Sequence, residues 1–115
     1  MLESEVLSFL NEFKGAVSIS PRGIQYASRK ENVETILDLE LTQKQVDQVL
    51  LSLELSNYYQ GPLPNDQYGN NPMWEFGRFI KGKEVYIKIT STKNGPFCIS
   101  FHYSKYRMSY TFKKI

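Results

Sequence analysis

The chain is poor in the residues that build cross-linked or metal-bound frameworks. Its 115 residues include one cysteine and one histidine. A lone cysteine excludes an internal disulfide, and structural zinc sites take four ligands drawn mainly from cysteine and histidine. We therefore expect neither a metal site nor any other cofactor.

Long apolar runs are also lacking. No segment approaches the roughly 20 apolar residues that a transmembrane helix needs. The first fifteen residues carry Glu3, Glu5, Glu12 and Lys14, unlike a signal peptide. Length and composition, with 41% hydrophobic and 23% charged residues, favour a single domain over residues 1–115. We expect a cytoplasmic protein with no membrane partner.

The net charge of +2 conceals two halves of opposite sign. Residues 1–66 hold five Lys/Arg and ten Asp/Glu, whereas residues 67–115 hold nine Lys/Arg and two Asp/Glu. A basic half indicates a polyanionic partner, although a chance distribution of surface charge explains the numbers equally well.

Hydrophobic spacing predicts three helices in the first half. Residues 3–14 place apolar residues three and four apart and are followed by Gly15, a good helix terminator. Residues 29–39 show a helical pattern through Val33, Ile36 and Leu37. A third helix follows Thr42 and Gln45, which form a capping box ahead of an apolar stripe.

The second half predicts a sheet. Residues 58–72, "YYQGPLPNDQYGNNP", contain three prolines and two glycines and predict a long loop. "MWEFGRFI", "KEVYIKITS" and "FCISFHYS" alternate polar and apolar residues and are separated by short turns. Residues 107–113 alternate again. Helices followed by strands predict an α+β fold, with the N-terminal helices packed on one face of a C-terminal antiparallel sheet.

Alternation gives this sheet a polar face. Tyr86 and Lys88 point away from Val85 and Ile87, and His102 points away from Phe101. On simple alternation Phe97, Ile99 and Phe101 share the core face, and Cys98, Ser100 and His102 share the polar one. Such a face is often only solvated. The sole histidine, a tyrosine and mainly positive neighbours favour a functional site.

These side chains suit RNA cleavage without a metal. The reaction needs a base for the ribose 2′-hydroxyl, an acid for the leaving 5′-oxygen and cations for the phosphorane charge. A thiolate–imidazole pair does not fit, because Cys98 and His102 would lie roughly 13 Å apart along a strand. Aromatic side chains also suit single-stranded RNA, whose bases stack on them.

The same segments carry a family resemblance. "WEFGRFIKGKEVYIKI", "CISFHYS" and "MSYTF", preceded by "LELSNYYQGP", resemble the MqsR family of bacterial type II toxin–antitoxin systems over roughly residues 42–112. The resemblance implies a RelE-like fold and a sequence-specific endoribonuclease that cleaves mRNA and inhibits translation. It also implies a cognate antitoxin that neutralises the toxin, and the ribosome is a further candidate partner.

Some residues of this chain match the functional positions of the family, and others differ from the residue the family has there. Tyr86 matches the family tyrosine, and Glu75 stands where the best-known member has glutamine after the tryptophan. Gln60 and His102 stand where that member has lysines, and Arg107 stands at a proline position. We therefore predict Tyr86, Lys88 and His102 as catalytic residues, and Gln60, Glu75 and Arg107 as substrate-binding residues. The alternative is a non-catalytic RNA- or protein-binding module on the same scaffold.

Overall fold

The computed structural model describes residues 1–113, and within them an α+β fold is confirmed. A five-stranded sheet has the order β1-β5-β4-β3-β2. Its short edge strand β1 pairs in parallel with β5, and the other neighbours are antiparallel. The sheet is therefore mixed, where a purely antiparallel one was predicted. The elements are α1 Leu2–Ile19, β1 Gln25–Tyr26, α2 Lys30–Asp38, α3 Gln43–Leu51, η1 Leu55–Asn57, β2 Tyr58–Leu63, β3 Met73–Ile80, β4 Lys83–Thr92 and β5 Gly95–Tyr103.

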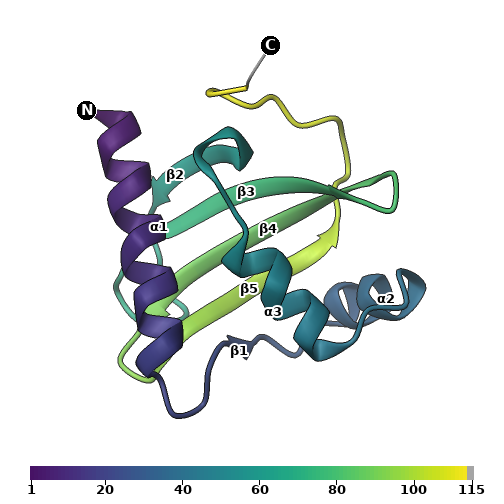
Figure 1. Ribbon diagram of the computed structural model, residues 1–115, viewed down its shortest axis with the longest axis horizontal. Helices are drawn as coiled ribbons and strands as arrows, with labels where there is room; N and C mark the ends of the chain where they lie inside the picture. The colour runs from purple at the N-terminus through teal and green to yellow at the C-terminus, as the bar shows by residue number, and fades with distance from the viewer. Residues whose placement is uncertain (114–115) are drawn as a thin grey trace.

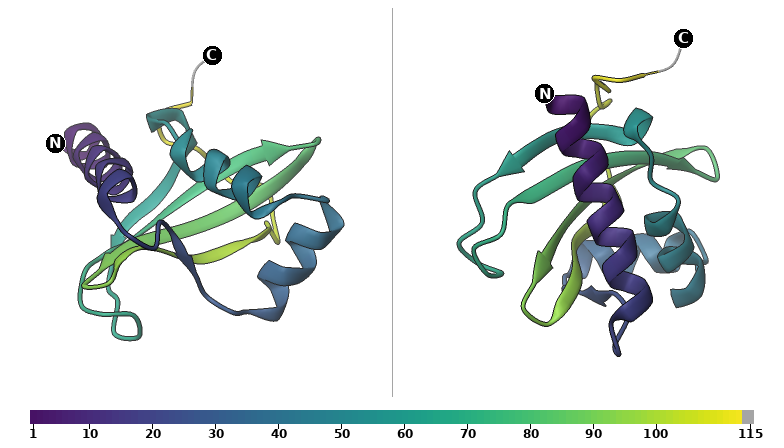
Figure 2. Two further views of the ribbon diagram at one scale, coloured as in Figure 1. Left: turned by 60° about the horizontal axis from the view of Figure 1, so that its bottom comes forward. Right: turned by 60° about the vertical axis from the view of Figure 1, so that its left-hand side comes forward.

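Two helices cover one face of the sheet. Helices α1 and α3 lie over that face, and α2 lies beside the β5 end of the sheet (Figures 1 and 2). The predicted stripe of α1 is confirmed, since Val6, Leu10 and Phe13 are buried. Phe9 stacks on Trp74 of β3 with ring centroids 5.0 Å apart. The sheet contributes buried apolar side chains to this core, among them Phe76, Val85, Ile87, Ile89 and Phe101.

The helix boundaries confirm one prediction and correct another. The capping box at the start of α3 is present, with both Thr42–Gln45 hydrogen bonds formed. Helix α1 does not end at Gly15 but continues to Ile19. It ends there because Pro21 disfavours helical backbone in the residue before it, Ser20. A single internal glycine lowers helix stability without stopping the helix.

The predicted apolar face of α2 is confirmed at Ile36, which packs against the core, and is wrong at Val33 and Leu37. Val33 and Leu37 are 50% and 71% exposed, whereas Asn32 and Thr35 are buried. The buried polar pair faces the edge of β5, where backbone groups need partners. The Asn32 amide donates to the Ile99 carbonyl at 3.0 Å and accepts from the Phe101 N–H at 2.9 Å. The Tyr103 N–H donates to the Thr35 hydroxyl at 3.3 Å.

The two segments predicted least well, residues 58–72 and 107–113, lie close together, with the Tyr58 and Phe112 ring centroids 5.6 Å apart. The predicted loop begins with strand β2, which pairs irregularly with β3 around Gly61 and Pro62. Proline is tolerated there because β2 is an edge strand. Residues 107–113 form no strand. Their segment turns back instead, with the Met108 N–H and the Tyr110 hydroxyl donating to the Glu84 carboxylate.

A bulge in β5 changes which face of the sheet the side chains before it point to. Lys88 pairs with Ser100, but the next residue Ile89 pairs with Cys98, so Ile99 is an extra residue. Extra residues of this kind reverse the facing of the chain beyond them. Cys98 is consequently buried in the core, and Phe97 joins the face of Lys88 and Ser100. The predictions for Phe97 and Cys98 were therefore wrong.

We predict that Asn32→Ala lowers the free energy of unfolding by about 2 kcal/mol or more, because it leaves a buried backbone donor and acceptor on β5 without partners. Chemical denaturation measures the change. The exposed Asn11→Ala is the matched control and should stay within about 0.5 kcal/mol. A loss for Asn32→Ala as small as that of the control would contradict the role given to the amide.

Candidate functional site

The predicted polar residues meet on the sheet face opposite α1 and α3. Register places Gln60, Glu75, Lys88 and Ser100 in one row across β2, β3, β4 and β5. Tyr86 and His102 form a pair in the neighbouring row. Together they line a pocket of about 430 Å³, here called the central pocket. Five of the six predicted site residues lie in it, and Arg107 does not.

The central pocket is more enclosed than the open face predicted from alternation. Glu75 and Ser100 are only 7% and 1% exposed. Walls rise from two segments outside strands β2 to β5. One is the start of α2 and the residue before it, and the other is the chain after β5. Their lining residues are Arg29, Glu31, Ser104, Lys105, Tyr106 and Met108.

Glu75 organises the floor of the central pocket. The Tyr86 hydroxyl donates a hydrogen bond to Glu75 Oε2, and Lys88 Nζ lies 4.0 Å from the same oxygen. Burial raises the pKa of Tyr86 above its ordinary value, and the hydrogen bond and negative charge of Glu75 raise it further. Tyr86 therefore keeps its proton throughout the neutral range, as an ordinary tyrosine does, and the raised pKa makes its hydroxyl a weaker acid.

His102 lies beside Tyr86 and has a ring nitrogen that can accept a proton. Its ring centroid lies 5.2 Å from that of Tyr86. His102 Nδ1 lies 3.0 Å from the Tyr103 carbonyl oxygen, and a carbonyl only accepts hydrogen bonds. The proton of the neutral ring is therefore assigned to Nδ1, which leaves Nε2 with a free lone pair. Nε2 lies 3.9 Å from Glu31 Oε2.

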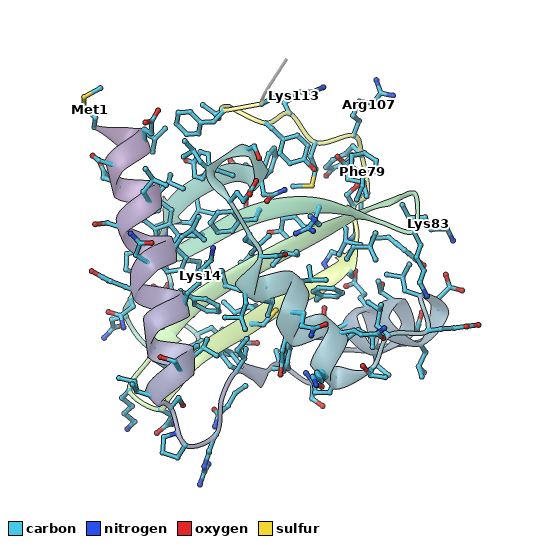
Figure 3. The ribbon with its side chains drawn as sticks, in the orientation of Figure 1. Met1, Lys14, Phe79, Lys83, Arg107 and Lys113 are labelled. Atoms are coloured by element: carbon cyan, nitrogen blue, oxygen red, sulfur yellow. The ribbon has the colours of Figure 1, made fainter. Side chains whose placement is uncertain are left out.

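One cation of the central pocket, in addition to Lys88, comes from a segment that the sequence analysis did not assign to the site. Arg107 is exposed, and its side chain points away from the sheet (Figure 3). Arg29 lines the pocket instead, with Nη1 3.5 Å from the Ser100 hydroxyl and Nη2 3.4 Å from the Tyr68 hydroxyl. Arg29 belongs to the acidic half of the chain and precedes Ser100 by 71 residues. No local sequence pattern therefore connects it to the site.

No family model, curated protein or solved structure matches the chain. The RelE-like fold and the likeness to MqsR toxins accordingly remain hypotheses based on the sequence. No helix within residues 1–113 combines the length and the apolar character that crossing a bilayer demands. In the same described region, no three side chains among His, Cys, Asp and Glu gather closely enough to hold a metal ion.

We predict that Glu75→Gln lowers the pKa of Tyr86, because the substitution removes the carboxylate that favours the protonated phenol. Alkaline titration of phenolate absorbance, with Tyr86→Phe identifying the transition, measures the shift. Glu84→Gln is the matched control, because Glu84 accepts from Tyr110 instead. Wild-type Tyr86 ionising in the ordinary tyrosine range would contradict the assignment.

The same shift has a consequence for stability. Unfolded tyrosines ionise near pH 10, whereas native Tyr86 holds its proton to higher pH. Its contribution to the free energy of unfolding is thus complete below about pH 10 and is lost as pH rises above that value.

Proposed function

We propose that this protein is a metal-independent endoribonuclease that cleaves mRNA and thereby inhibits translation. One observation carries the proposal: a protonated tyrosine and a histidine with a free Nε2 lie side by side in a pocket that also holds Arg29 and Lys88. An acid, a base and cations are the groups that cleavage by the ribose 2′-oxygen requires.

In the proposed reaction His102 is the base and Tyr86 the acid. His102 Nε2 takes the proton of the 2′-hydroxyl, and the 2′-oxygen bonds to the adjacent phosphorus. The bond from phosphorus to the 5′-oxygen breaks, and Tyr86 gives that oxygen its proton. The products are a 2′,3′-cyclic phosphate and a free 5′-hydroxyl. Solvent then reprotonates Tyr86 and takes the proton from His102.

The remaining pocket residues hold the substrate. Arg29 can make two parallel hydrogen bonds to a phosphate, and Lys88 adds a second positive charge to the phosphorane. Glu75 keeps Tyr86 protonated and positioned, and Gln60 at the edge of the row offers an amide to a base. These roles replace Arg107 by Arg29, retain substrate binding for Gln60 and change the role of Glu75 from binding substrate to positioning Tyr86.

On the basis of the resemblance to the MqsR toxins, we also propose that an antitoxin protein neutralises this protein. A cognate antitoxin would cover or distort the central pocket, with the acidic helical half as a separate docking surface. The setting would be the cytoplasm, where mRNA and ribosomes are found. The exposed side of α1 includes Glu3, Glu5 and Glu12, which favour a basic segment of that antitoxin.

One observation favours the non-catalytic alternative. The Tyr86 hydroxyl already donates to Glu75, so it must leave that partner to protonate a leaving group. In a module that only binds RNA or protein, the hydroxyl would stay with Glu75 and the pocket would accept a ligand unchanged. Cleavage assays separate the two functions.

We predict that His102→Gln lowers the rate of RNA cleavage about 10²–10⁴-fold, because glutamine keeps the size but cannot take a proton. The assay follows a labelled RNA in EDTA and detects the 2′,3′-cyclic phosphate end. Tyr103→Phe is the control, since its hydroxyl contacts Asp38 outside the pocket. Normal cleavage by His102→Gln, or cleavage that EDTA abolishes, would refute the mechanism.

We predict that Arg29→Gln weakens RNA binding and Arg107→Gln does not, because only Arg29 lines the central pocket. Losing one phosphate contact should also make the slope of log affinity against log salt less negative by about one. Titrations of fluorescent RNA at several salt concentrations measure both quantities. If Arg107→Gln had the larger effect, the site would have to include the exposed segment after β5.

A further inference from the structure

A second pocket lies on the same sheet face, beyond the central pocket along β5. It has a volume of about 590 Å³, within the range of small-molecule sites. We call it the distal pocket. Its lining includes the rings of Tyr68 and Phe97, the Lys93 ammonium and the amide side chains of Gln25, Asn70 and Asn94.

The Ile99 bulge brings an aromatic ring into the distal pocket. Without the bulge, Phe97 would share the core face of Phe101. With it, Phe97 turns to the face of Ser100 and His102 and packs against Tyr68, with ring centroids 5.0 Å apart. Bulges next to functional sites commonly re-aim a side chain in this way.

Arg29 and Tyr68 connect the two pockets. Arg29 lines the central pocket and Tyr68 lines the distal one. The guanidinium lies 6.0 Å from the Tyr68 ring centroid and donates to the Tyr68 hydroxyl. From His102 to Phe97 the strand runs roughly 16 Å, at about 3.3 Å per residue. A ligand that reaches both pockets is therefore longer than one nucleotide and passes over Arg29.

The chemistry of the distal pocket suits a nucleobase. Two aromatic rings offer a surface for stacking, and amide side chains can donate to and accept from a base edge. Among the described residues that line it, Lys93 is the one charged side chain, so nothing there repels a phosphate. An apolar peptide segment would leave these amides without partners, which disfavours it as the occupant.

We infer that the distal pocket is a second base-binding subsite, in which a single-stranded RNA seated in the central pocket stacks an unpaired base on Phe97. The inference rests on the proposed function for the identity of the ligand. Arg29 contacts the backbone between the two subsites, and Lys93 contacts a phosphate beyond the second one. Duplex RNA binds poorly, because its bases are not free to enter.

The test measures binding alone, with probes that cannot be cleaved. Oligoadenylates and oligouridylates carrying 2′-O-methyl groups, two or ten nucleotides long, are titrated by fluorescence polarisation. Phe97→Leu retains apolar packing but removes the ring, and Phe97→Tyr retains the ring. Phe79→Leu, at an aromatic 61% exposed on β3, is the matched control. Melting temperatures verify that each variant is folded.

We expect Phe97→Leu to weaken binding of the long probe about five-fold or more and to leave the short probe unchanged. Phe97→Tyr and Phe79→Leu should bind both probes like the wild type. Wild-type affinity in Phe97→Leu, or equal losses for both probes, would overturn the subsite. Absence of RNA binding by the wild type would overturn it as well.

The outcomes separate this inference from the proposed function. If the length-dependent loss appears but no RNA is cleaved, the subsite stands and the endoribonuclease does not. If cleavage requires His102 but Phe97→Leu binds normally, the endoribonuclease stands and the subsite does not.

Discussion

The hydrogen bonds between the Asn32 amide and the backbone of β5 are the constraint on which the site depends. They hold the strand on both sides of Ser100, at the bulge where Ile99 is the extra residue. Before the bulge Cys98 enters the core, and after it Ser100 and His102 face Lys88 and Tyr86. The same bonds place the start of α2, and with it Arg29 and Glu31, at the wall of the central pocket.

Different surroundings give the two titratable rings of the pocket different chemistry. Tyr86 is partly buried against Glu75, so its proton is retained. His102 has one nitrogen against a backbone carbonyl and the other near Glu31, which leaves a proton acceptor with a carboxylate close by. The proposed RNA cleavage uses this division directly.

Local sequence patterns predict some of these features and miss others for physical reasons. The capping box at Thr42 and Gln45 and the alternation around Tyr86 depend on neighbouring residues, so they can be predicted. The bulge at Ile99 is hydrogen-bonded by Asn32, which is distant in the chain, and simple alternation places Phe97 and Cys98 on the wrong faces. Val33 and Leu37 were predicted to face the core but are exposed, because the buried side of α2 carries Asn32 and Thr35, which hydrogen-bond the backbone of β5. Arg29 could not be found, since tertiary packing alone brings it to Ser100.

We propose that the sheet face opposite α1 and α3 binds single-stranded RNA. Backbone amide chemical shifts, followed by NMR while an uncleavable 2′-O-methyl RNA is added, test it most directly. We expect the largest changes at Lys88, Ser100, His102 and Phe97, with α1 and α3 nearly unchanged. Changes confined to α1 and α3, or no changes at low salt, would contradict it.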